Sequence, residues 1–216
     1  TRTISSAASD VYKRQDINAD GFLDIYVSNS GDIKGDNKQN ELFINNGDLT
    51  FTEMANEYGL DDKGYSTHAA FFDFDRDGDL DCYLLNNSYK GGFRITSIGK
   101  DQRPVRDEVG GDKLFENDNG KFIDISEEAG IYGSVIGFGL GVTVGDANND
   151  GWMDIYVSND FFERDYLYIN NQDGTFSENL ETMIKSISAA SMGGDMADIN
   201  NDGLSELFVR DMLPQR

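Results

Sequence analysis

Oxygen-bearing side chains recur at alternate positions in four short acidic loops, a pattern that could hold metal ions. The first, third, fifth and ninth residues carry carboxylate or amide oxygens, and the seventh offers its backbone carbonyl. These positions are Asp16, Asn18, Asp20, Phe22 and Asp24; Asp73, Asp75, Asp77, Asp79 and Asp81; Asp146, Asn148, Asp150, Trp152 and Asp154; and Asp198, Asn200, Asp202, Leu204 and Glu206. Calcium takes about six to eight oxygen ligands at flexible angles, so each loop predicts one Ca²⁺ site. The chain would then hold up to four ions.

A glycine fills the sixth position of every loop, where the backbone must reverse and aim the next carbonyl inward. These glycines are Gly21, Gly78, Gly151 and Gly203. The closest alternative is an EF-hand, which needs a glutamate at the twelfth position and flanking helices. Here the twelfth residues are aliphatic and lie in β-type patterns: Val27, Leu84, Val157 and Val209. Magnesium, which prefers a rigid octahedral shell, and acidic turns without an ion stay open as alternatives, but four matching copies favour calcium.

The same strand signals flank each loop, which predicts that β-strands position it. An alternating apolar strand follows every loop, and a hairpin with Asn, Asp or Gly at its turn follows in the first three repeats. Strands of small residues precede three of the loops, at 67–72, 139–144 and 192–197. Successive first aspartates stand 57, 73 and 52 residues apart. Four antiparallel strands in each such period are typical of a β-propeller blade.

We therefore predict an all-β fold of four-stranded antiparallel propeller blades, in a partial ring of about three blades and the start of a fourth. The expected blades are residues 16–64, 65–133, 134–188 and a truncated unit at 189–216. Residues 1–15 are expected to be a foreign or disordered segment, and the inner strand of the first blade to be missing or atypical. Basic side chains gather in an insertion at 89–111 of the second blade, which we interpret as a solvated surface excursion.

The charge of the chain limits its partners. Forty Asp and Glu residues against 18 Lys and Arg give a formal net charge of -22. This charge would repel a nucleic-acid backbone and an anionic membrane surface, so we predict no nucleic-acid partner. No apolar run approaches the ~20 residues that span a bilayer, so we predict no direct membrane insertion. The single cysteine, Cys82, cannot form an internal disulfide and says nothing about the compartment.

The repeated loops and their flanking strands resemble a known family. The acidic loop, the small-residue strand before it and the apolar strand after it look like the FG-GAP or VCBS repeat, the blade unit of the integrin alpha-subunit β-propeller. The resemblance covers about residues 16–211. The segments Asp-Ile-Ser-Glu-Glu-Ala-Gly-Ile at 124–131 and Val-Arg-Asp-Met-Leu-Pro at 209–214 look most like bacterial surface proteins of the ASPIC/UnbV type, also similar to the cartilage acidic protein group.

The resemblance implies an extracellular or cell-envelope propeller whose calcium ions stiffen the blade loops. It implies a protein or carbohydrate ligand at the cell surface and no catalytic residues. The leading prediction is thus a calcium-binding, non-catalytic scaffold for adhesion or ligand binding. The alternative is a propeller-type carbohydrate-active lyase or hydrolase with its site on a loop rim. His68, the only histidine, could act as its base, although a structural role is the plainer interpretation.

Overall fold

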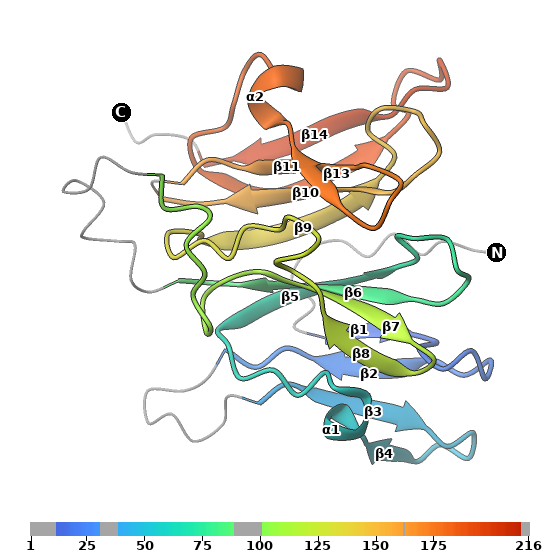
Figure 1. Ribbon diagram of the computed structural model, residues 1–216. Helices are drawn as coiled ribbons and strands as arrows, with labels where there is room; N and C mark the ends of the chain where they lie inside the picture. The colour runs from blue at the N-terminus through green and yellow to red at the C-terminus, as the bar shows by residue number, and fades with distance from the viewer. Residues whose placement is uncertain (1–11, 31–38, 89–100, 162, 213–216) are drawn as a thin grey trace.

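Antiparallel β-sheets make up the described part of the chain (Figure 1). The computed structural model describes residues 12–30, 39–88, 101–161 and 163–212. The first sheet contains β1 (Tyr12–Gln15), β2 (Asp24–Val27), β3 (Glu41–Asn45) and β4 (Phe51–Glu53). The second contains β5 (Ser66–Phe72), β6 (Asp81–Asn86), β7 (Lys113–Asp118) and β8 (Lys121–Asp124).

The third sheet contains β9 (Gly139–Gly145), β10 (Asp154–Asn159), β11 (Tyr166–Asn170) and β12 (Phe176–Glu178). The last has two strands, β13 (Ser191–Ala197) and β14 (Glu206–Asp211). Single-turn helices, α1 (Ala55–Tyr58) and α2 (Leu180–Met183), follow the first and third sheets. In every sheet each strand pairs with the next one in the chain. The predicted all-β fold of three blades and the start of a fourth is confirmed.

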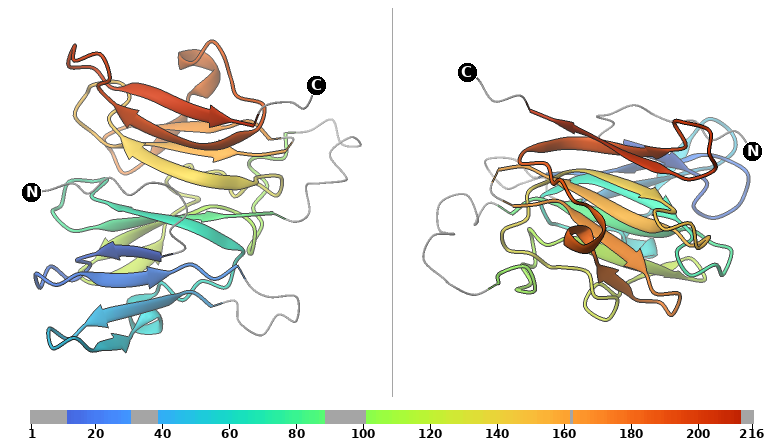
Figure 2. Two further views of the ribbon diagram at one scale, coloured as in Figure 1. Left: turned by 180° about the vertical axis from the view of Figure 1, so that it is seen from behind. Right: turned by 90° about the horizontal axis from the view of Figure 1, so that it is seen from above.

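Apolar side chains alternate between the two faces of each sheet, so each sheet packs on its neighbours in the chain. In β6, Cys82 and Leu84 join a cluster with residues of the first sheet, whereas Tyr83 and Leu85 join a cluster with the third. All four side chains are fully buried. Burial on both faces explains why β6 reads as a continuous apolar run. The sheets consequently follow one another in chain order, from blue to red in Figures 1 and 2.

The first strands of the sheets lie side by side. β5 packs against β1 and β9, and β9 packs against β13. A Cβ atom on Gly139 would come within 2.3 Å of Leu85 Cδ1, and one on Gly141 within 3.3 Å of the Cα of Gly193. Small residues are needed here because strands of neighbouring sheets approach each other so closely. Across the same interfaces, the Thr143 hydroxyl donates a hydrogen bond to the Gly194 carbonyl at 2.8 Å.

The first blade differs from the sequence pattern at its inner strand. β1 pairs antiparallel with β2 over its whole length, so the strand position before Asp16 is filled. Its residues, Tyr-Lys-Arg-Gln, are large and polar where the other inner strands have small residues, which is why the pattern did not reveal it. Of the basic insertion, residues 89–100 lie outside the described residues. No helix within the described ranges is long and apolar enough to cross a bilayer.

Candidate metal sites in the blade loops

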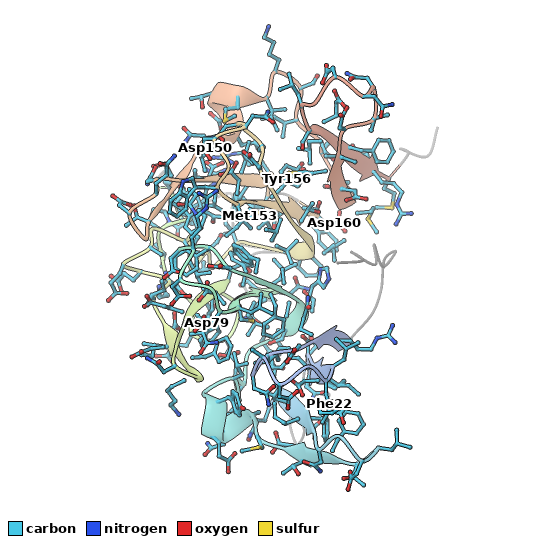
Figure 3. The ribbon with its side chains drawn as sticks, turned by 90° about the vertical axis from the view of Figure 1, so that its right-hand side faces the viewer. Phe22, Asp79, Asp150, Met153, Tyr156 and Asp160 are labelled. Atoms are coloured by element: carbon cyan, nitrogen blue, oxygen red, sulfur yellow. The ribbon has the colours of Figure 1, made fainter. Side chains whose placement is uncertain are left out.

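Each acidic loop joins the first and second strands of its sheet, so the four loops occupy equivalent places in the fold. Each predicted ligand set therefore lies within one loop of one blade, and within the described part of the chain only the second loop gathers three acidic side chains closely enough to hold a metal ion. Figure 3 labels Asp79 in the loop of the second sheet and Asp150 in the loop of the third, with Phe22 at the end of the molecule formed by the first sheet. The loops differ in their internal hydrogen bonds, however, and this difference shows which of them fits a metal ion best.

Loops one, three and four share an internal hydrogen-bond pattern. In the third loop, Asp146 accepts the N–H groups of Asp150 at 3.1 Å and Gly151 at 2.9 Å. Asn148 accepts the Asp150 N–H at 3.0 Å, and Asp150 accepts the Trp152 N–H at 2.8 Å. The same bonds recur in the other two loops with donor–acceptor distances of 2.8–3.1 Å. The side-chain oxygens thus hold the loop backbone in its turn.

The second loop lacks part of this pattern and is left with unpaired oxygens. Asp75 and Asp77 still accept N–H bonds at 3.1 and 3.0 Å. Asp73 Oδ1 and Asp79 Oδ1, by contrast, are buried and have no hydrogen-bond partner. One oxygen each from Asp73, Asp75 and Asp81 lies within 4.8 Å of the others. Buried carboxylate oxygens without donors are costly unless a cation satisfies them, so this loop fits a divalent metal ion best.

The pKa values of the second loop reflect this crowding. Burial, followed by the charges of Asp77, Asp75 and Asp73, raises the pKa of Asp79 from 3.8 to about 6. Burial raises the pKa of Asp81 to about 7, although it accepts N–H bonds from Asn117 and Phe74. A bound cation would favour the charged form of these groups and reverse the shifts. The residues of this loop therefore suit the hard oxygen-ligand chemistry of calcium.

The sequence analysis did not identify the side chain of Asp79 as part of the site. The sequence pattern assigns only the backbone carbonyl of this residue to the ion, whereas its buried side-chain oxygen also belongs to the acidic group. The signal was present, because the second loop alone has an acid at all five alternate positions. At the equivalent position the other loops have Phe22, Trp152 and Leu204.

The ninth residue of each loop has a structural role beside its predicted role as a ligand. Asp154 is fully buried and accepts the N–H of Ala147 at 2.8 Å and the N–H of Asn170 at 2.9 Å. It therefore ties the start of the loop to the third strand of the blade. Asp24 and Asp81 make the equivalent pair of bonds at 2.9–3.0 Å. Each carboxylate oxygen has a second lone pair, so this role leaves capacity for an ion.

A matching set of asparagines was also missed. An asparagine lies in the last two residues of the third strand of each complete blade: Asn45, Asn117 and Asn170. Each donates its backbone N–H to the ninth carboxylate and its amide to the carbonyl of the eighth loop residue, at 3.2–3.4 Å. An asparagine does recur at the beginning of each hairpin turn in the sequence. We interpreted it there only as a turn-forming residue.

Side chains connect the second and third loops directly. The guanidinium of Arg76 donates to the Gly151 carbonyl and lies 4.4 Å above the centre of the Trp152 ring. The Asn170 amide donates to the Phe74 carbonyl at 2.8 Å. Hydrogen bonds, from the Trp152 N–H above all, lower the pKa of Asp150, and the charge of Arg76 adds to the effect. These contacts fix the positions of the second and third loops relative to each other before any ion binds.

His68, the base that the enzymatic alternative requires, has a structural contact. Its Nδ1 accepts the Val142 N–H at 3.2 Å, across the interface between the second and third sheets. The acceptor nitrogen is thus used to align two inner strands. In the basic insertion, Arg103 donates to the buried carboxylate of Glu163 at 2.6 Å. That arginine ties the insertion to the third blade.

Comparison with known families gives a match along most of the chain. The FG-GAP-like repeat matches residues 16–84, 105–157 and 148–209, which together contain all four acidic loops. The chain belongs to the FG-GAP-like repeat family. The family resemblance inferred from the loops and strands is thereby confirmed, and it agrees with the four-stranded sheets. No curated protein matches this FG-GAP-like chain. The closer likeness to ASPIC/UnbV-type proteins stays a prediction.

Proposed function

We propose that this FG-GAP-like chain is a calcium-stabilised, non-catalytic scaffold at the cell surface that binds a protein or carbohydrate ligand. FG-GAP repeats suggest a propeller scaffold for adhesion or ligand binding and are typical of extracellular domains. The proposal adds calcium, a cell-surface location, a carbohydrate as a possible ligand and the absence of catalysis to what the family match supports. The calcium assignment rests above all on the second loop, where buried oxygens of Asp73 and Asp79 have no hydrogen-bond partner.

Calcium would supply positive charge and ligand bonds at positions where the fold gathers carboxylates. Asp73, Asp75 and Asp81 would hold the ion in the second loop, with Asp79 beside them. Extracellular calcium is abundant, so a dissociation constant on the order of 10⁻⁴ to 10⁻³ M would suffice. The non-catalytic part of the proposal is supported by the hydrogen bonds that already engage Asp154 and His68 in structural roles.

Calorimetric titration with Ca²⁺ tests the proposal. The wild-type chain should bind Ca²⁺, and the double substitution Asp73→Asn with Asp75→Asn should remove the second-loop site from the binding stoichiometry. This variant keeps oxygen atoms and side-chain shape but removes two negative charges. Trp152, the only tryptophan, lies in the third loop, so its fluorescence reports binding there independently. The third-loop response should persist in the variant.

The matched control is Asp48→Asn, a change in an exposed hairpin turn where Asp48 accepts only local bonds from Thr50. It removes one negative charge without touching a loop and should leave calcium binding unchanged. Absence of calcium binding by the wild type would refute the calcium assignment. Equal binding by the wild type and the second-loop variant would show that the ion lies elsewhere.

A further inference from the structure

The third position of the acidic loops differs between the blades. It is Asn18 in the first loop, Asn148 in the third and Asn200 in the fourth, whereas the second loop has Asp75. Asparagine and aspartate have nearly the same shape, but the asparagine amide donates hydrogen bonds and carries no charge, whereas an ionised carboxylate only accepts them. A nitrogen atom in place of an oxygen atom therefore changes what each loop can do for its own acids.

In the first and third loops, the asparagine satisfies the acid two positions further on. The Asn18 amide donates to Asp20 Oδ2 at 2.9 Å, and the Asn148 amide donates to Asp150 Oδ2 at 3.0 Å. The oxygen of each asparagine accepts the backbone N–H of the same acid, at 3.1 and 3.0 Å. In the fourth loop, the Asn200 amide donates to the ninth residue instead, at 2.7 Å. In all three loops an amide thus takes up a carboxylate oxygen.

The second loop has no such internal donor. Asp75 accepts the Asp77 N–H at 3.1 Å, but its ionised side chain has no hydrogen to donate. One oxygen of Asp73 and one of Asp79 are buried without a hydrogen-bond partner. Asp73 also lacks the two backbone N–H bonds that the first acid accepts in each of the other loops. The acids of this loop therefore repel one another with no amide between them.

The cationic side chains of the protein do not make up for the missing donor. Arg76 lies in the middle of the second loop, but its guanidinium donates to the Gly151 carbonyl and lies 4.4 Å from the centre of the Trp152 ring. None of the salt bridges among the described residues includes an acid of the second loop. A cation from solution is the partner that remains for the buried oxygens of this loop.

We propose that the third residue of a loop determines how strongly that loop depends on Ca²⁺, an inference that rests on the calcium-binding function proposed above. Asp75 makes the second loop the tightest site and the one that needs its ion to hold its shape. Asn18 and Asn148 close their loops without an ion. Calcium must compete there with an amide that already satisfies an oxygen of the fifth acid, so it binds more weakly. The second loop therefore fills first as the Ca²⁺ concentration rises.

Reciprocal exchanges between asparagine and aspartate test the proposal on the full chain. Asp75→Asn should weaken the tightest Ca²⁺ site in a calorimetric titration about tenfold and raise the melting temperature in chelator. Asn148→Asp should lower the Ca²⁺ concentration at the midpoint of the Trp152 fluorescence change about tenfold and lower the melting temperature in chelator. Because Asn148 is exposed, its variant keeps the test decisive where Asp75→Asn fails to fold.

The matched control is Asn149→Asp, which adds the same charge at the next position, an exposed one that supplies no predicted ligand. It should shift the Trp152 midpoint much less than Asn148→Asp does. Equal shifts by the two variants would overturn the proposal, as would an unchanged tightest site in Asp75→Asn. Absence of Ca²⁺ binding by the wild type would refute the proposed function as well. Calcium binding by the wild type with unaltered affinities in both exchanges would refute this inference alone.

Discussion

Asp150 and Asp154 stand four residues apart in the third loop but have opposite surroundings. Asp150 is exposed at the surface of the loop, whereas Asp154 is fully buried beneath it. Asp154 satisfies two backbone N–H groups from different parts of the blade. The sequence pattern gives both residues the same role as ligands. In the structure, Asp154 holds the fold through these two bonds, whereas Asp150 makes only contacts at the surface of the loop region.

Asp154→Ala should destabilise the chain far more than Asp150→Ala when calcium is absent. The first substitution leaves the buried N–H groups of Ala147 and Asn170 without an acceptor, at a cost of about 3 kcal/mol. Asp150 makes local bonds at the surface, so its loss should have a small effect under the same conditions. Urea unfolding in chelator measures both changes. Equal destabilisation by the two variants would contradict the structural role of Asp154.

A second buried acid lies outside the loops, before the third strand of the second blade. Asp112 accepts the Asn86 N–H and the Tyr83 hydroxyl, both at 3.0 Å, and burial raises its pKa from 3.8 to about 7. In the first blade, Asn40 holds the equivalent place: it accepts the Asn29 N–H, and its amide donates to the Tyr26 hydroxyl at 2.9 Å. An asparagine therefore completes the same contacts without a charge.

Asp112→Asn should stabilise the chain increasingly as the pH rises from about 4 to 7. The folded-state pKa lies above the unfolded value, so the contribution of Asp112 to stability is complete below about pH 4 and is lost as the pH approaches 7. The free energy of unfolding of the variant minus that of the wild type should rise by up to about 1.4 kcal/mol per pH unit in this window. Urea unfolding across the pH series measures it, and a flat difference would contradict it.

At the scale of elements, the sequence predicted the strands well because period-two apolar patterns and hairpin turns report on local structure. The inner strand at 67–72 and the turn between β11 and β12 lie where the residues indicate. The inner strand of the first blade was not predicted, since its packing partner β5 is distant in the chain and its residues are large and polar. The single-turn helices are too short for any periodic pattern.

The candidate site also has some features that the sequence predicted and others that depend on long-range packing. The alternate oxygens and the glycine of each loop are local features, so the sequence could place four equivalent loops. What distinguishes the second loop is the burial of Asp73 Oδ1 and Asp79 Oδ1, which depends on neighbouring segments. The link from Arg76 to Trp152 likewise joins residues of two blades that lie 76 positions apart. Contacts of this range arise from packing of the sheets and leave no local pattern.

At the scale of the whole molecule, the formal charge of -22 acts against the compact state. Fourteen acids stand at the alternate positions of the four loops, so much of the repulsion is concentrated there. Calcium would neutralise it locally, whereas a monovalent salt would only screen it from outside. The two effects can therefore be told apart in one series of melting curves.

Adding chelator should lower the melting temperature by several degrees relative to about 10 mM Ca²⁺. An ion that binds only the folded state at tenfold to hundredfold excess over its dissociation constant contributes about 2 kcal/mol per site. For a domain of this size, each 1 kcal/mol corresponds to about 2–4 °C. Sodium chloride at matched ionic strength should recover only part of the loss, and Mg²⁺ less than Ca²⁺, because magnesium prefers a rigid octahedral shell. A melting curve indifferent to chelator, or restored fully by sodium chloride, would mean that the loops hold their shape through the Asp and Asn hydrogen bonds alone.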